Sequence, residues 1–142
     1  MIRRSLIGGL IVLGLTGTAL AQNSLGELLD GGGKKLSKDA VKSALGGAQV
    51  SGKSVTGAST EYVYKPDGSF SGNLQNSDGW KSGAVGTWSV DDGGKLCSEW
   101  ILTSNSKRFK GCGFLYAKAD ELYYVESDSD RAAPIYKRVI KK

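Results

Sequence analysis

The sequence contains no histidine, only two cysteines and a single methionine at its first position. Without histidine, the commonest general base and the commonest metal ligand are both missing, which excludes Ser-His-Asp and Cys-His catalysis and histidine-ligated zinc or iron. Two cysteines also cannot supply the four thiolates of an all-cysteine zinc site or an iron–sulfur cluster. We therefore expect a protein that holds no metal or other cofactor and is not an enzyme.

A hydrophobic run long enough to span a membrane is also missing. Arg3-Arg4 precede an apolar stretch over residues 6–15, and Ala19-Leu20-Ala21 follow it. A basic start, a short apolar stretch and an A-x-A end are typical of a secretory signal peptide, whereas a spanning helix needs about 20 apolar residues. We expect cleavage after Ala21, export to the periplasm or the medium, and no membrane anchor on the cleaved chain.

A strong excess of charge of one sign is the third absence. Once residues 1–21 are removed, the 121 residues that remain carry 17 basic and 14 acidic groups, a net charge of +3. This charge is too small to indicate nucleic-acid binding, and an exported protein rarely meets such a partner. A chain of this length fits one domain with one core.

Glycine, in contrast, is abundant, with 21 residues, about twice the usual share of roughly 7%. Gly31-Gly32-Gly33 lies in a segment with little apolar material, so residues 22–35 are interpreted as a flexible N-terminal lead that can include a short turn of helix around Leu25 to Leu29. The single domain would then cover residues 36–142. Ser37 as N-cap, Asp39 in the first turn and glycine after Leu45 predict one short helix over residues 38–45.

From Gly47 onward, apolar and polar residues alternate with a period of two. Turns such as Pro66-Asp67-Gly68 separate the alternating segments, which is typical of strands joined by tight hairpins. The pattern predicts a mainly β fold, an antiparallel up-and-down meander of seven or eight strands that forms a small lipocalin-like barrel or a curled sheet. The expected strands cover residues 49–52, 60–65, 69–75, 86–90, 95–102, 107–117, 122–126 and 135–140.

The two cysteines predict a disulfide and a strand register. In an oxidising compartment Cys97 and Cys112 are expected to pair, and the midpoint between them falls in the polar stretch over residues 103–106, where a hairpin turn is expected. The bond would close a loop of about 15 residues, worth about 3 kcal/mol in the chain-entropy model. The same register sets two favourable pairs opposite each other: Glu99 with Lys110, and Trp100 with Phe109.

One formal motif requires an interpretation. Residues Gly47 to Ser54 match the phosphate-binding pattern G-x-x-x-x-G-K-[ST]. That loop needs a buried strand before it and a helix after it, but here a helix-like segment precedes and residues 55–60 are poor helix formers. We expect a Gly/Ser-rich start of the sheet and no nucleotide as a partner.

Three further groups of residues are candidates for function. Glu61 and Glu99 are carboxylates on expected strands and are interpreted as solvated, and Lys137-Arg138 as part of a solvated strand edge. Inward-facing aromatic residues either fill the barrel as core or line a pocket for an apolar ligand, and both alternatives stay open. These aromatic residues are Tyr62, Tyr64, Phe70, Trp88, Trp100 and Tyr124.

Several local motifs together resemble a family of small exported bacterial proteins, the domain of unknown function 995. The resemblance covers residues 36–127 and rests on the short helix, Tyr64-Lys65-Pro66-Asp67-Gly68, Gly86-Thr87-Trp88-Ser89-Val90, Lys95-Leu96-Cys97 and the second cysteine, Cys112. It implies a lipocalin-like meander barrel and assigns no catalytic or ligand residues.

The export signal, barrel and disulfide are also similar to those of periplasmic inhibitors of secreted metalloproteases, which insert an N-terminal tail into the protease. The main expectation is an exported, non-enzymatic binding or interaction module whose partner is a protein or a small apolar ligand. The alternatives are a protease inhibitor that uses its N-terminal lead, and a carrier of a small apolar ligand.

Overall fold

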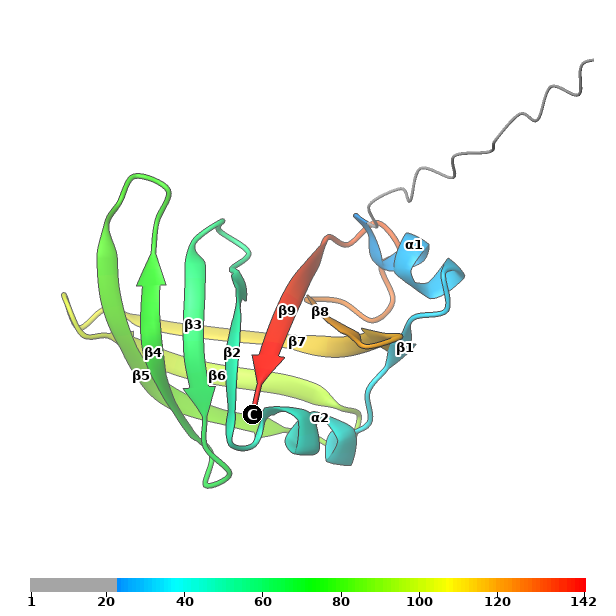
Figure 1. The fold of residues 1–142 in the computed structure, drawn as a ribbon, viewed down its shortest axis with the longest axis horizontal. Coiled ribbons are helices and arrows are strands. Elements are labelled where there is room, and N and C mark those ends of the chain that lie inside the picture. Colours follow the sequence, from blue (N-terminus) through cyan, green and yellow to red (C-terminus); the bar gives the residue numbers. More distant parts are fainter. Residues whose placement is uncertain (1–22) are drawn as a thin grey trace, which may run out of the picture.

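The structure, a computed structural model, describes residues 23–142, and the predicted signal peptide lies outside the described residues. It contains two helices and nine strands (Figure 1). The elements are α1 (Leu25–Asp30), β1 (Lys34–Lys35), α2 (Lys38–Leu45), β2 (Ala48–Lys53), β3 (Ser59–Tyr64), β4 (Ser69–Gln75), β5 (Lys81–Val90), β6 (Lys95–Leu102), β7 (Arg108–Lys118), β8 (Glu121–Val125) and β9 (Ile135–Lys141).

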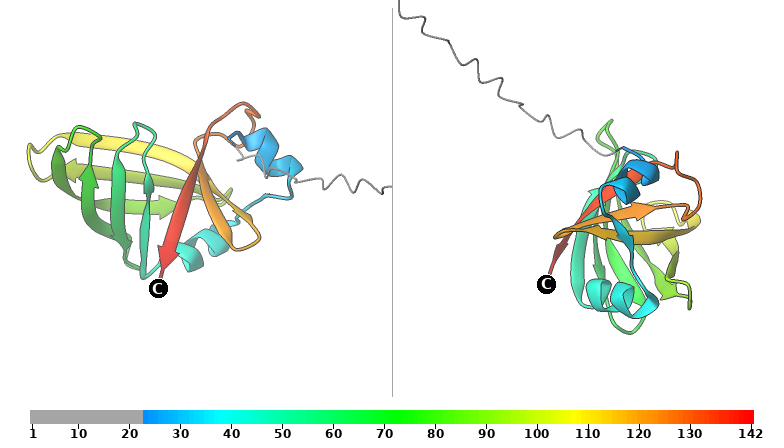
Figure 2. Two further views of the ribbon diagram at one scale, coloured as in Figure 1. Left: turned by 45° about the horizontal axis from the view of Figure 1, so that its top comes forward. Right: turned by 90° about the vertical axis from the view of Figure 1, so that its right-hand side faces the viewer.

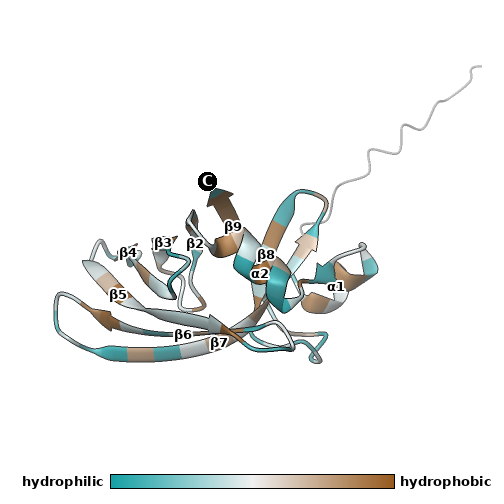
Figure 3. Cartoon of the chain, turned by 90° about the horizontal axis from the view of Figure 1, so that it is seen from below, coloured by the Kyte–Doolittle hydropathy of each residue, from teal (hydrophilic) through white to brown (hydrophobic). Residues whose placement is uncertain are grey.

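Strands β2 to β9 form a closed antiparallel barrel. Each of these strands pairs with the next along the chain, and β9 pairs with both β8 and β2, which joins the two ends of the meander. Hydrophilic and hydrophobic residues alternate along the first part of β7 (Figure 3), as expected for a strand with one face inside and one outside. The predicted mainly β meander is confirmed, and of the two expected forms it is the barrel.

The register derived from the two cysteines is confirmed. Cys97 and Cys112 are direct partners on β6 and β7 and form a disulfide. The two other predicted pairs are also formed: Lys110 Nζ lies 3.5 Å from Glu99 Oε1, and the rings of Trp100 and Phe109 stack with centroids 5.7 Å apart.

Strand β5 is twice as long as expected. The sequence predicted a strand only over residues 86–90, whereas β5 begins at Lys81. The part that was not expected includes Gly83 and Ala84, which have a low intrinsic strand propensity, but residues 81–87 pair with β4 and residues 84–90 with β6. Tertiary pairing here overrides local preference.

The segment that matches the phosphate-loop pattern starts the sheet, as expected. Residues 48–53 form β2, which pairs with β3 on one side and with β9 on the other. Gly47 has a φ of 79°, a left-handed conformation that few residues other than glycine adopt, and it turns the chain from α2 into β2.

The N-terminal lead, expected to be flexible, is packed against the barrel from Ser24 onward. Ser24 caps α1, whose Leu25 and Leu28 are both 0% exposed and pack in a second apolar cluster with residues of β7 and β8. Lys34 and Lys35 form β1, which pairs with β7. Figure 2 shows α1 outside the barrel wall. The expectation of a flexible lead is therefore wrong for this segment.

Helix α2 has the predicted bounds and closes one end of the barrel. Its Val41 and Leu45 are buried in the main core cluster together with residues of β2 and β4–β7 (Figures 1 and 2). At six and eight residues, neither helix of residues 23–142 has the length and apolarity needed to cross a membrane.

Candidate functional site: the barrel cavity

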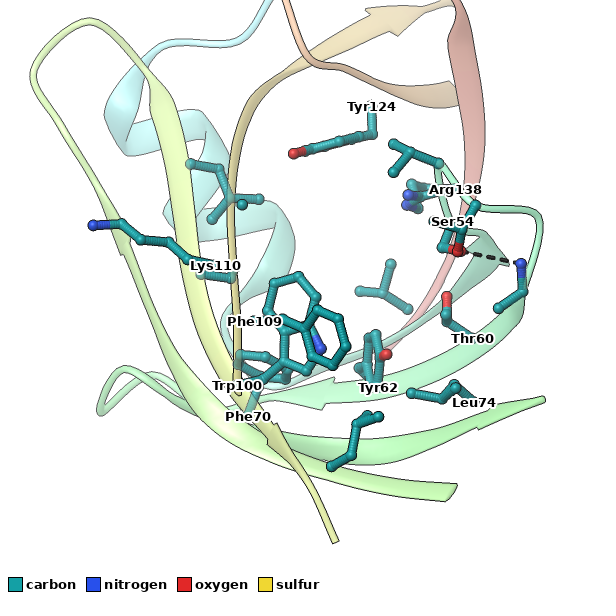
Figure 4. Close-up of a pocket in the computed structure, with 18 of the residues that line it drawn as sticks. Ser54, Thr60, Tyr62, Phe70, Leu74, Trp100, Phe109, Lys110, Tyr124 and Arg138 are labelled. Carbon is teal, nitrogen blue, oxygen red and sulfur yellow. Dashed lines mark hydrogen bonds between the residues drawn. The ribbon is translucent and has the colours of Figure 1, made fainter. Parts of the chain in front are cut away.

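The barrel interior holds a cavity of about 580 Å³ (Figure 4). Its floor includes Leu45 of α2, together with Val50, Leu96 and Leu115 from the barrel wall. At the opposite end, residues of the β2–β3, β4–β5 and β6–β7 loops line it. The cavity is therefore a cup that α2 closes at one end and three loops surround at the other.

Aromatic residues form much of the cavity wall. Five of the six aromatic residues singled out in the sequence line it: Tyr62, Tyr64, Phe70, Trp100 and Tyr124. Tyr64 and Phe70 stack with ring centroids 5.3 Å apart, and Tyr62 meets the edge of Phe70 at 5.4 Å. These five residues are thus placed to contact a ligand.

Trp88 has a different position from the other five. It is 8% exposed and belongs to the main core cluster, as Phe70 does at 4% exposed, but unlike Phe70 it does not line the cavity. Its Nε1 donates to the carbonyl oxygens of Lys65 at 3.0 Å and Ser69 at 3.2 Å, which fastens the β3–β4 turn at the closed end. Of the two alternatives for these aromatic residues, Trp88 is core.

Aromatic rings of the cavity wall pack directly against glycines on neighbouring strands, where a side chain would clash with them. A Cβ on Gly113 would lie 2.4 Å from the ring of Tyr124, and a Cβ on Gly86 would lie 2.8 Å from the ring of Phe70. Both rings therefore lie against bare backbone on the wall. Because the rings are at the wall, the centre of the barrel stays open.

Arg138 of β9 is a charged residue that lines the cavity and is partly shielded from solvent. Its Nη1 donates to the carbonyl oxygens of Lys53 at 2.8 Å and Lys137 at 3.2 Å, and its guanidinium lies 5.3 Å from the ring centroid of Tyr124. None of the ion pairs formed within residues 23–142 includes Arg138. A partly buried guanidinium thus lies in the cavity without a carboxylate partner.

Sequence reasoning missed Arg138. It was interpreted with Lys137 as part of a solvated edge, but β9 pairs with β8 over residues 135–138 and with β2 over residues 138–141, so Arg138 itself has a paired strand on each side. The alternation of side chains along a strand could have identified it, because neighbouring residues point to opposite faces. Lys137 points outward and pairs with Glu121 at 3.1 Å, so Arg138 points inward.

Burial sets the protonation of the polar groups in the cavity. Burial lowers the pKa of Arg138 below its ordinary value, and nearby tyrosine hydroxyls act against that shift. Burial also raises the pKa of Tyr64 to about 12 and that of Tyr124 to about 12, although the positive charge of Arg138 opposes both shifts. At neutral pH these hydroxyls are therefore protonated and able to donate hydrogen bonds beside a cation.

The loops around the open end expose large apolar side chains. Val55 is 45% exposed, Trp80 38% and Phe109 37%, and all three line the cavity. They lie on or next to three different loops, so apolar surface surrounds the opening rather than a single side of it.

The carboxylates considered as catalytic candidates are not brought together. Glu61 is an exposed residue of β3 that contacts Gln49, and Glu99 is exposed on β6 and pairs with Lys110. Neither lines the cavity. Within residues 23–142, no group of three or more Cys, Asp or Glu side chains is arranged to hold a metal ion.

Comparison with known proteins gives one family and no individual relative. The family described as "Protein of unknown function (DUF995)" matches residues 15–138. No curated protein and no solved structure matches the chain.

Proposed function

The chain belongs to the DUF995 family of proteins of unknown function, and we propose that it is a non-enzymatic carrier that holds a small, largely apolar molecule inside its barrel. The observation that carries the proposal is the cavity of about 580 Å³. Sites for small molecules usually measure about 300–1,000 Å³ and are lined mainly by apolar and aromatic side chains.

The open cavity is unfavourable for a barrel that serves only as a scaffold. Wall residues next to an open space lose the contacts that a packed core would give them, which reduces stability. A bound apolar molecule restores these contacts and removes the partly exposed rings of Tyr62 and Trp100 from water. The arrangement is therefore best explained by a ligand that occupies the space.

We also propose that the carrier acts outside the cytoplasm. The Cys97–Cys112 disulfide favours an oxidising compartment, and the sequence before Gln22 has the pattern of a secretory signal. Inhibition of a protease by a free N-terminal tail receives less support, because Leu25 and Leu28 hold this segment against the barrel.

The carrier proposal can be tested with a substitution that fills the cavity with a large side chain. Ser98 lines it, so Ser98→Trp adds an indole to the open space, whereas Ser71→Trp adds the same group to the exposed outer face of β4. We expect the neutral apolar probe N-phenylnaphthylamine to bind the wild type and Ser71→Trp alike, and to bind Ser98→Trp at least about tenfold more weakly, since the probe's apolar contacts are lost.

Probe titration and native mass spectrometry of the purified protein together decide the matter. A co-purified small molecule that the wild type and Ser71→Trp retain and Ser98→Trp loses would support the carrier. Equal probe affinity for all three folded proteins, or no probe binding to the wild type, would contradict it.

A further inference from the structure

The cavity has a polar side and an apolar side. Figure 4 shows Arg138 and Tyr124 on one side of the open space, and Phe70, Trp100 and Phe109 across from them. Ser54 and Thr60 lie close to Arg138 and add hydroxyl groups on the polar side. A ligand that fits this division has a polar end and an apolar body.

The hydrogen-bonding capacity of Arg138 is only partly used. A guanidinium has five N–H donors, and the protein acceptors of Arg138 within residues 23–142 both contact Nη1. No side-chain hydrogen bond within residues 23–142 includes the hydroxyl of Tyr62 or Tyr124, both residues line the cavity, and no unpartnered polar side-chain atom in this part of the chain is fully buried. Donors of Arg138 and both hydroxyls are therefore free for a ligand.

The other charged residues that line the cavity are all exposed. Lys110 points away from the open space and pairs with Glu99, Lys107 lies over the exposed ring of Phe109, and Glu126 follows the end of β8. Arg138 is the one charged lining residue in the described part of the chain that is partly shielded from solvent. The charge that is shielded from solvent in the cavity is therefore positive, although the exposed carboxylate of Glu126 is close enough to Tyr124 to help burial raise its pKa.

We propose that the ligand is an amphipathic anion whose carboxylate or phosphate group binds Arg138. Its apolar chain would lie along Phe70, Trp100 and Phe109. This proposal rests on the carrier function proposed above. A guanidinium forms strong, charge-assisted hydrogen bonds to either kind of oxyanion. The protonated hydroxyls of Tyr62 and Tyr124 supply further donors to it. An anion also gives Arg138 the countercharge that the protein itself does not provide.

The first experiment compares head groups on the unaltered protein. Dodecanoate, dodecyl phosphate and dodecanol share one chain length and each displaces bound N-phenylnaphthylamine if it enters the cavity. We expect the two anions to bind at least about tenfold more tightly than the alcohol at low salt, because a charge-assisted hydrogen bond contributes about that much to affinity. A larger gain for one anion than for the other identifies the class of head group.

The second experiment removes the charge. Arg138→Met keeps much of the side-chain length without the guanidinium, and Arg108→Met makes the same change at an exposed residue that does not line the cavity. We expect Arg138→Met to bind the anions and dodecanol with similar affinity, with its affinity for dodecanol close to that of the wild type. Arg108→Met should keep the wild-type preference for anions.

Binding of dodecanol reports that a variant is folded and that the cavity is intact, so a failure of the head-group site is distinct from a failure of the carrier. Equal affinity of the wild type for dodecanoate, dodecyl phosphate and dodecanol would overturn the anion site and leave the carrier in place. A preference for anions that survives in a folded Arg138→Met variant would overturn the role of Arg138. Absence of binding of all three ligands to the wild type would overturn both proposals.

Discussion

At the scale of single residues, position across the barrel decides what an aromatic side chain does. Trp88 and Tyr64 come from the same alternating pattern, yet Trp88 is fixed by two carbonyl groups in the core, and Tyr64 faces the cavity. Alternation predicts that both point inward. It does not predict what each one meets there, because the open space depends on glycines such as Gly113 on other strands.

Tyr64 provides a test of burial through pH. Because its pKa is about 12 in the folded protein and about 10 in an unfolded chain, only the unfolded state ionises between these values. Any stability linked to this hydroxyl is complete below pH 10 and is lost as the pH rises toward 12. The free energy of unfolding should fall by up to about 1.4 kcal/mol per pH unit from this residue.

Urea denaturation and tyrosinate absorbance over this pH range measure the effect. Tyr64→Phe is the control, because lysines and other tyrosines titrate in the same range and remain in both proteins. We expect a shallower loss of stability in Tyr64→Phe than in the wild type. Identical slopes would mean that Tyr64 ionises as readily in the folded protein as in the unfolded chain.

At the scale of elements, the packing of α1 against the barrel could not be predicted from the sequence of the helix and its flanking residues alone. Gly31-Gly32-Gly33 suggested a flexible segment, and a six-residue helix has little stability of its own. The informative pattern lies in β8, where Leu122-Tyr123-Tyr124-Val125 is apolar on both faces of the strand. A strand of this kind has to be covered on both sides, and α1 covers its outer face.

Leu28→Ala tests whether α1 is a stable part of the fold. The side chain is 0% exposed, so its truncation should lower the free energy of unfolding by about 2–5 kcal/mol. Leu29→Ala, on the partly buried face of the same helix, should cost clearly less. Chemical denaturation measures both, and equal small losses would indicate a lead that does not pack against the barrel in solution.

The β6–β7 hairpin is the element that the sequence predicted best. Two cysteines, an opposite-charge pair and an aromatic pair all specify one register around one polar turn, and each constraint is local in sequence. The first half of β5, residues 81–85, had no comparable signal, because Gly83 and Ala84 lower its strand propensity. Only its two neighbours hold this segment in the sheet.

At the scale of the whole molecule, β9 turns a curled sheet into a barrel with a cavity. It pairs with β2 and β8, and its Arg138 reaches the carbonyl of Lys53 next to the cavity. The sequence left barrel and curled sheet as alternatives because this closing contact joins segments far apart along the chain, without a turn between them to set the register. The cavity and its cation therefore exist only once the barrel is closed.

This dependence predicts how ligand binding changes the dynamics of the barrel. A ligand that contacts Arg138 on β9, Tyr124 on β8 and Tyr62 on β3 binds only the closed form, so it stabilises that form by about 2.7 kcal/mol at a concentration one hundred times its dissociation constant. Saturation with dodecanoate should therefore slow hydrogen exchange most at the amides of β9 and β2. The β6–β7 hairpin should change less, because the disulfide already limits its opening.

Hydrogen exchange followed by mass spectrometry, with and without dodecanoate, measures this difference, and Arg138→Met is the matched control. In that variant the added protection of β9 should shrink, while any protection from the apolar chain at the cavity wall stays. Protection spread evenly over all strands would show that the ligand stabilises the barrel as one unit. Selective protection of β9 that depends on Arg138 would show that the ligand acts chiefly on the strand that closes the barrel.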